Sequence, residues 1–153
     1  MKRFLIYATT VLLLLMLSAC GLESRQDRVL SSLGRWERRN FYTSGGFQDF
    51  TDFAIYAYPE ADLTESPYFA HLGEGDRERL SGFLDNFEGW IESIGHSDPQ
   101  NEVVVHYAFD RRLMDTRDWF YIYEDLDYPE FGCYDLWFFD SQTHVLYYFH
   151  SNI

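Results

Sequence analysis

The chain has 153 residues, of which 25 are acidic and 12 are lysine or arginine, so its formal net charge is −13. A surface this acidic repels phosphate groups, which excludes binding to nucleic acid or to an anionic bilayer through bulk electrostatics. Cations and basic partners remain compatible with this charge.

The N-terminal segment has the pattern of an export signal. Lys2 and Arg3 precede a mostly apolar run from Phe4 to Leu17, and small residues follow it. The run is shorter than the roughly 20 apolar residues that a membrane-spanning helix needs. The sequence therefore predicts a cleaved signal over residues 1–19 instead of a permanent transmembrane helix.

The four residues that close this segment, Leu17, Ser18, Ala19 and Cys20, resemble the lipobox of bacterial lipoproteins. The resemblance implies that Cys20 receives a diacylglyceryl group through a thioether and becomes the first residue after cleavage. Two or three acyl chains make a stable tether, because each buried CH₂ contributes roughly 0.8 kcal/mol. We expect a lipid-anchored, extracytoplasmic protein of the cell membrane or outer membrane. The alternative is an ordinary secretory signal followed by an unmodified cysteine.

Residues 20–42 are predicted to form a lipidated N-terminus and a basic stem helix. Apolar residues at helical spacing extend to about Arg39, and the segment holds five arginines against three acidic residues. Residues 43–153, with five arginines against 22 acidic residues, are predicted to be a single acidic domain of charge −17. The stem arginines either face an anionic membrane or cover a helix face and pair with the acidic domain.

Three more helices are predicted before Pro99. Residues 50–58 fit a helical face that Pro59 ends, although alternation fits almost as well. Ser66 followed by Pro67 predicts a short helix over residues 67–72. Asp76 is a candidate N-cap of a longer helix that Gly95 ends. Its apolar face is assigned to the core and consists of Leu80, Phe83, Leu84, Phe87, Trp90, Ile91 and Ile94.

The remainder of the chain reads as four strands, because branched and aromatic residues dominate it. The predicted strands are 103–109, 119–123, 133–139 and 145–149. In the last hairpin, Asp140 is expected to bond the loop backbone and His144 to tolerate a positive φ. Helices followed by strands predict an α+β fold, in which N-terminal helices pack on a four-stranded antiparallel meander.

Both faces of that last hairpin are apolar, so a single helical layer cannot cover the sheet. Either the stem helix covers the second face, or its aromatic side chains form a platform for a protein, peptide or glycan. If the hairpin loop spans residues 141–143, the candidate binding residues Trp137 and Tyr147 share a face. The full candidate set is Trp119, Tyr121, Tyr123, Trp137 and Tyr147.

No catalytic set, metal site or cofactor motif is predicted. Cys133, which has no partner for an intrachain disulfide, is expected to be buried in its strand. With a loop at 141–143, Cys133 and His150 fall on opposite faces, whereas a loop that differs by one residue reverses this. Four acidic residues in a predicted loop could hold a hard cation but lack the spacing and glycine of an EF-hand, so a solvated acidic loop is favoured. They are Glu124, Asp125, Asp127 and Glu130.

These features favour a noncatalytic binding or protein-interaction module of the cell envelope, similar to many small bacterial lipoproteins. One alternative is a small hydrolase-like envelope enzyme, which requires a pocket where a histidine or carboxylate meets a second polar group. Another is an immunity-type inhibitor of a basic partner, which net charge alone supports.

Overall fold

A computed structural model describes residues 24–45, 49–125, 127 and 131–152. The chain divides into two compact units, Met1–Ser32 and Leu33–Ile153. The described part of the first unit contains the helix α2 (Arg25–Ser32). The predicted signal segment and the predicted lipobox lie outside the described residues. No helix in the described ranges is long and apolar enough to span a bilayer.

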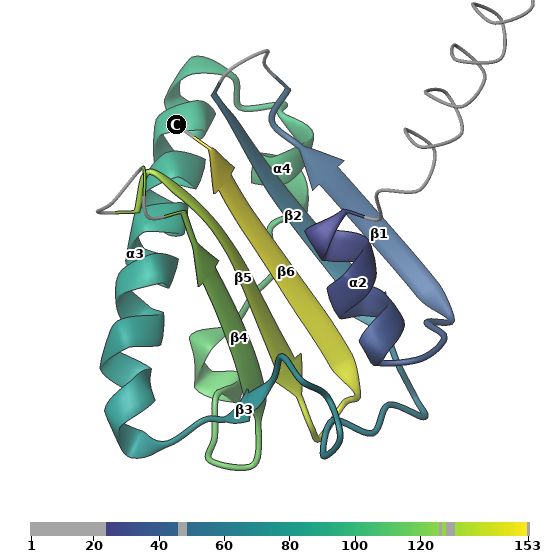
Figure 1. The fold of residues 1–153 in the computed structure, drawn as a ribbon. Coiled ribbons are helices and arrows are strands. Elements are labelled where there is room, and N and C mark those ends of the chain that lie inside the picture. Colours follow the sequence, from purple (N-terminus) through teal and green to yellow (C-terminus); the bar gives the residue numbers. More distant parts are fainter. Residues whose placement is uncertain (1–23, 46–48, 126, 128–130, 153) are drawn as a thin grey trace, which may run out of the picture. The chain divides into compact units, whose positions relative to one another are not determined.

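The second unit is built on a six-stranded antiparallel sheet with the strand order β1-β2-β6-β5-β4-β3 (Figure 1). This confirms an α+β fold and corrects the predicted number of strands from four to six. The C-terminal strand β6 lies inside the sheet between β2 and β5. The strands are β1 (Arg38–Thr43), β2 (Phe50–Ala57), β3 (Ala70–His71), β4 (Trp119–Glu124), β5 (Cys133–Asp140) and β6 (Val145–Asn152).

The long helix α3 (Glu74–Ser97) lies along one face of the sheet (Figure 1). It is followed by the short helix α4 (Glu102–His106) and a 3₁₀ turn, η1 (Arg111–Leu113). The buried face of α3 holds Leu80, Phe83, Leu84 and Phe87, which pack with aromatic residues of the sheet. Full burial of each such side chain contributes roughly 1.5–3 kcal/mol, so this layer supplies the main core.

The ends of α3 differ from those predicted. The helix begins after Gly73, and the Asp76 carboxylate accepts a hydrogen bond from the Gly73 backbone N–H at 3.1 Å. Asp76 therefore caps from inside the first turn. Gly95 does not end the helix. A Cβ at Gly95 would lie 3.4 Å from Cγ1 of Val104, so this glycine permits α4 to approach α3 closely.

Two segments have the opposite secondary structure to the one predicted. Residues 50–57 form β2 and not a helix, because this interior strand is buried on both faces and its polar alternation is lost. Residues 102–106 form α4 and not a strand. The Asn101 side chain caps it by accepting from the Val103 N–H, and packing against α3 overrides the β propensity of its valines.

The stem helix and the short helix at 67–72 also require correction. α2 ends at Ser32, and Gly34 adopts a φ of +85°, a conformation typical of residues just beyond a helix C-terminus. Residues 38–43 then form the edge strand β1. Ala70 and His71 pair with β4 as the opposite edge strand. The expectation that the stem helix covers the second sheet face stays a prediction.

The hairpin between β5 and β6 has the predicted chemistry but a loop of four residues, since Asp140 pairs with Val145. The Asp140 carboxylate accepts from the backbone N–H of Gln142 at 2.8 Å, and His144 has a φ of 55°. Both expectations are confirmed. The extra loop residue shifts the register by one, which moves every β6 side chain to the face opposite the predicted one.

Candidate functional site

The structure separates the five residues of the predicted binding face. Trp119, Tyr121, Tyr123 and Trp137 lie on the sheet face opposite α3. Tyr147 lies on the other face, within the core against Phe109, because of the register shift in the hairpin. The assumption that Trp137 and Tyr147 share a face is therefore wrong.

Three of the other four aromatic side chains of that set, those of Trp119, Tyr121 and Trp137, pack against neighbouring rings. Trp137 is fully buried, and its ring centroid lies 5.1 Å from those of Tyr121 and Tyr148. Trp119 is half-buried, and its ring centroid lies 3.6 Å from that of His71. These contacts occupy much of the contact area that a ligand would need, so the predicted platform is a weak candidate site.

A better candidate lies where the C-terminal end of α3 meets the start of β2. Here the surface encloses a hollow of about 300 Å³. We call it the Trp90 hollow. The residues that line it include Asp49, Phe50, Trp90, Ser93, Asp98 and Asn101. Its volume is at the small end of the range for ligand pockets.

Several elements position these side chains. Trp90 and Ser93 are three residues apart on α3, so they lie on one helix face. Asp98 is the first residue beyond that helix. Asn101 caps α4, and its Nδ2 donates to the carbonyl oxygen of Ser44 at 3.0 Å, which ties the β1–β2 hairpin to the α3–α4 connection.

The Trp90 hollow combines an aromatic surface with unused polar groups. The half-buried Trp90 ring has no aromatic partner in the described part of the chain, unlike the other three tryptophans. The side chains of Asp49 and Ser93 have no hydrogen-bond partner among the described residues. A flat aromatic ring beside hydrogen-bond acceptors and a hydroxyl suits a ligand with one apolar face and a polar edge.

A second polar group lies on the sheet face opposite α3, and we call it the His150 cluster: Asp52, Asp135, Tyr148 and His150. Oδ1 of Asp135 lies 2.8 Å from Nδ1 of His150 and accepts a hydrogen bond from the Tyr148 hydroxyl at 2.7 Å. Burial, followed by the nearby Asp135 carboxylate, raises the pKa of Tyr148. Burial also raises the pKa of Asp52, whose Oδ1 has no partner within the described residues.

The same hairpin register brings Cys133 to this face. Cys133 pairs with Asn152 and Asp135 with His150, so the thiol and the imidazole are diagonal neighbours on one side of the sheet. The prediction that they lie on opposite faces is wrong. Cys133 is half-buried at the start of β5, not fully buried as expected.

The acidic loop after β4 does not assemble a metal site in the described residues. Asp127 donates its backbone N–H to Oδ1 of Asp125 at 3.0 Å, while Asp125 donates its N–H to the carbonyl oxygen of Cys133. Glu130 lies outside the described residues. Where the structure is described, no group of three His, Cys, Asp or Glu side chains is arranged to hold a metal.

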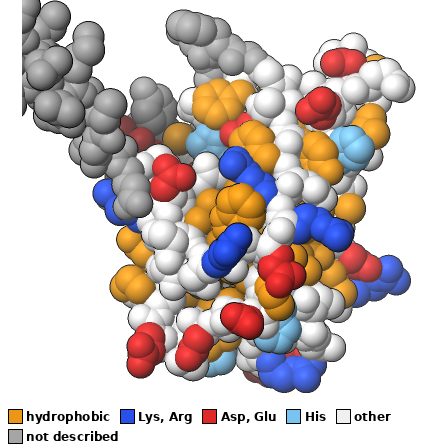
Figure 2. All heavy atoms as spheres, turned by 90° about the vertical axis from the view of Figure 1, so that its right-hand side faces the viewer, with side chains coloured by type: hydrophobic (Ala, Val, Ile, Leu, Met, Phe, Trp, Pro, Cys, Tyr) orange, Lys and Arg blue, Asp and Glu red, His pale blue; other side chains and the backbone are white. Residues whose placement is uncertain are grey.

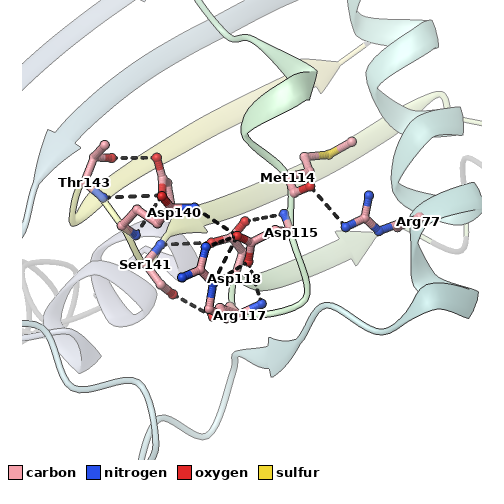
Figure 3. Close-up of polar contacts among 9 residues, drawn as sticks. Arg77, Met114, Asp115, Arg117, Asp118, Asp140, Ser141 and Thr143 are labelled. Atoms are coloured by element: carbon pink, nitrogen blue, oxygen red, sulfur yellow. Dashed lines mark hydrogen bonds and ion pairs between the residues drawn. The ribbon is translucent and has the colours of Figure 1, made fainter.

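A further carboxylate network supports the scaffold (Figure 3). The buried Asp118 accepts hydrogen bonds from the backbone N–H of Asp115 at 2.7 Å and of Ser141 at 3.0 Å. The Ser141 hydroxyl donates to the Arg117 carbonyl oxygen at 2.7 Å. Burial raises the pKa of Asp118. The network fixes the turn before β4 to the β5–β6 hairpin. These contacts give the buried Asp118 carboxylate a structural role.

Comparisons give no further guide to the site. No protein-family model matches the chain, and neither a curated protein nor a solved structure matches it. The function must therefore be inferred from the geometry of the chain's own side chains.

Sequence reasoning missed the Trp90 hollow because it assigned Trp90 to the core with the rest of its helix face. The four N-terminal members of that face are buried, whereas Trp90, Ile91 and Ile94 are half-buried. The available signal was polarity around the helix end, where Ser93, Ser97 and Asp98 interrupt the apolar pattern. Polar neighbours of a tryptophan near a helix terminus indicate a boundary between core and solvent.

Proposed function

We propose that this protein is a lipoprotein, held on the extracytoplasmic side of a membrane through lipid on Cys20, and that its folded domain is a noncatalytic glycan-binding module. Support for the tether is the coincidence of a basic start, a short apolar run and the Leu17–Cys20 motif. Mass spectrometry of the protein isolated from its own cells tests it. An intact N-terminus or an unmodified Cys20 thiol contradicts this part of the proposal.

The observation that supports glycan binding is the Trp90 hollow. A sugar ring presents C–H groups on one face and hydroxyls at its edge. The indole of Trp90 can pack against those C–H groups, while Asp49 and Ser93 offer unused hydrogen-bonding groups to the hydroxyls. The carboxylates of Asp49 and Asp98 disfavour an anionic ligand through repulsion. Neutral or amino-bearing glycans of the cell envelope are therefore the ligand class.

Titration calorimetry of the protein against a panel of envelope glycans tests the site. We expect Trp90→Ala to weaken binding by about 30-fold, because a central aromatic contact contributes about 2 kcal/mol. Trp119→Ala is the matched control, since Trp119 belongs to the alternative aromatic platform. Binding that survives Trp90→Ala and is lost in Trp119→Ala assigns the ligand to the platform and overturns the hollow as the site.

A second candidate function, a small thiol hydrolase, is favoured by one observation in the His150 cluster. Nδ1 of His150 is bonded to Asp135, which leaves Nε2 as the nitrogen able to accept a proton from a nucleophile, and Cys133 lies on the same face. Rates of Cys133 alkylation by iodoacetamide across pH discriminate the two functions. A reactive thiolate below neutral pH that His150→Gln abolishes supports the hydrolase, whereas an ordinary thiol profile excludes it.

A further inference from the structure

The arginines of the second unit fall into two groups. The five arginines after β1 all contact neighbouring groups. Three form ion pairs with carboxylates, namely Arg111 with Asp85 and Glu88, Arg112 with Asp110, and Arg117 with Asp115. Arg77 donates to the Met114 carbonyl oxygen, and Arg79 lies over the Phe83 ring. Arg35, Arg38 and Arg39 have no carboxylate partner in the described part of the chain, and neither do Arg77 and Arg79. Three of the five arginines of this unit that lack a carboxylate partner therefore lie within five residues at the start of β1, on a protein that is otherwise strongly acidic.

The exposed aromatic side chains lie in the same place. Among the described residues, the large hydrophobic side chains that are exposed are Trp36, Phe41 and Val105, and the first two flank the unpaired arginines with 40% and 36% of their surface exposed. Figure 2 views the molecule from the β1 side and shows hydrophobic and arginine side chains intermixed on this surface, with acidic side chains among and around them. We call this surface the β1 edge, and it consists of Arg35, Trp36, Arg38, Arg39 and Phe41.

Three side chains of the β1 edge are held beside one another. The Arg39 guanidinium lies 4.9 Å from the Phe41 ring centroid and 5.7 Å from that of Tyr56, and the Trp36 ring packs edge-on against Tyr56 at 6.3 Å. β1 is at the end of the sheet order, and its residues are exposed apart from the half-buried Tyr42. Because side chains alternate along a strand, Arg39 and Phe41 project from one face of this edge strand and Arg38 projects from the other.

We propose that the β1 edge docks the domain on an anionic lipid surface. Tryptophan and phenylalanine favour the interfacial region of a bilayer, and arginines above them attract anionic headgroups. Each arginine at such a surface raises the equilibrium for contact by about fivefold. The anionic headgroups repel the acidic remainder of the domain, so the charge distribution orients the β1 edge toward the membrane. The Trp90 hollow belongs to the part of the surface that does not contact the lipid.

A lipid surface is favoured over an acidic peptide by the position of the tether, so this inference rests on the tethering part of the proposed function. Arg35 follows Cys20 by 15 residues in the sequence. A chain of that length spans at most roughly 50 Å when fully extended. A lipidated Cys20 thus confines the β1 edge close to the bilayer, where even weak contacts are populated through high effective concentration.

The full-length chain reconstituted on vesicles tests the proposal. The vesicles consist of brominated phosphatidylcholine, alone or in an equimolar mixture with phosphatidylglycerol. Flotation with the vesicles reports the tether, whereas the share of tryptophan quenching that Trp36→Phe removes reports contact at the β1 edge. We expect that share to be large on the anionic vesicles and small on the neutral ones, and to fall as salt screens the headgroups.

Charge variants complete the test. Replacing Arg35, Arg38 and Arg39 by Gln should lower the anionic contact equilibrium by about 100-fold, the product of three fivefold effects. The matched control, Arg77, Arg79 and Arg112 replaced by Gln, removes the same charge elsewhere and should leave Trp36 quenching unchanged. Equal quenching on both vesicles, or protection of Trp36 by polyglutamate instead of by anionic lipid, overturns the proposal. If the protein does not float with the vesicles but added anionic vesicles still quench Trp36, the tether is overturned and the docking proposal is not.

Discussion

Nδ1 of His150 lies 2.8 Å from Oδ1 of Asp135, directly across the ladder that joins β5 and β6. Because the Tyr148 hydroxyl donates to the same oxygen, one carboxylate serves two polar side chains in a nearly buried position. Asp135→Ala should therefore lower the free energy of unfolding by about 2–3 kcal/mol, since it leaves two partners without an acceptor. Urea denaturation measures this loss.

The controls separate lost hydrogen bonds from lost charge. Asp135→Asn keeps an amide oxygen at the position of Oδ1 and should recover part of the stability. Asp62→Ala removes an exposed carboxylate that bonds only the neighbouring Thr64 in the described structure, and it should cost much less stability than Asp135→Ala. Equal losses for Asp135→Ala and Asp62→Ala contradict the importance of the His150 cluster.

Asp52 gives a prediction about pH. Burial raises its pKa above the ordinary value, so the ionised form opposes folding at pH values above the raised pKa. As pH falls from the raised pKa to the ordinary one, Asp52 becomes protonated first in the folded state and the penalty is lost. Asp52→Asn, which mimics the protonated form, should raise unfolding free energy at neutral pH and make no difference in acid. Urea titrations at several pH values measure this.

Asp110 provides the control of opposite sign. Its hydrogen bonds with Arg112 lower its pKa to about 2, so its ionised form favours folding at neutral pH. That stability is lost as pH falls toward this value. Asp110→Asn should therefore destabilise the neutral protein, with the difference shrinking in strong acid. The same direction of change for both variants at neutral pH contradicts the assignment.

The hydrogen bonds of Asp118 predict a large loss of stability when its carboxylate is removed from the turn before β4. Asp118→Ala removes the acceptor for two backbone N–H groups, those of Asp115 and Ser141, and should cost about 2–3 kcal/mol. Thr143→Ala, which removes a hydroxyl bond to Asp140 in the same region, should cost about 1 kcal/mol or less. Thermal unfolding compares the two, and equal effects would show that Asp118 does not fasten the turn (Figure 3).

How well the sequence predicted each element depended on what determines that element's structure. The β5–β6 hairpin was found because Asp140 and His144 act through local backbone chemistry. Its register was missed, because loop length depends on which residues finally pair, and a difference of one residue reverses every face. That single error separated Cys133 from His150 and joined Tyr147 to Trp137.

Elements defined by distant contacts were not predictable in the same way. β2 is an interior strand whose neighbours come from both ends of the second unit, so its two apolar faces resemble a helical pattern. The Trp90 hollow has the same origin, since it forms where α3 meets β2 and the residues before α4. The sequence analysis assigned its aromatic residue to the core, and only the tertiary structure places polar groups of other elements beside that residue.

The glycines of α3 offer a final matched pair that tests the approach of α4. A Cβ at Gly89 meets no atom within 4 Å, so Gly89→Ala should stabilise the protein by about 0.5–1 kcal/mol through helix propensity alone. At Gly95 the added Cβ would lie 3.4 Å from Cγ1 of Val104, the near limit of ordinary van der Waals contact, so the gain in stability should be smaller. Unfolding free energies of the two variants measure the difference. If Gly95→Ala stabilises as much as Gly89→Ala, then α4 does not pack as closely as described. In that case the effects of Gly95→Ala and Val104→Ala on the unfolding free energy should simply add in the double variant.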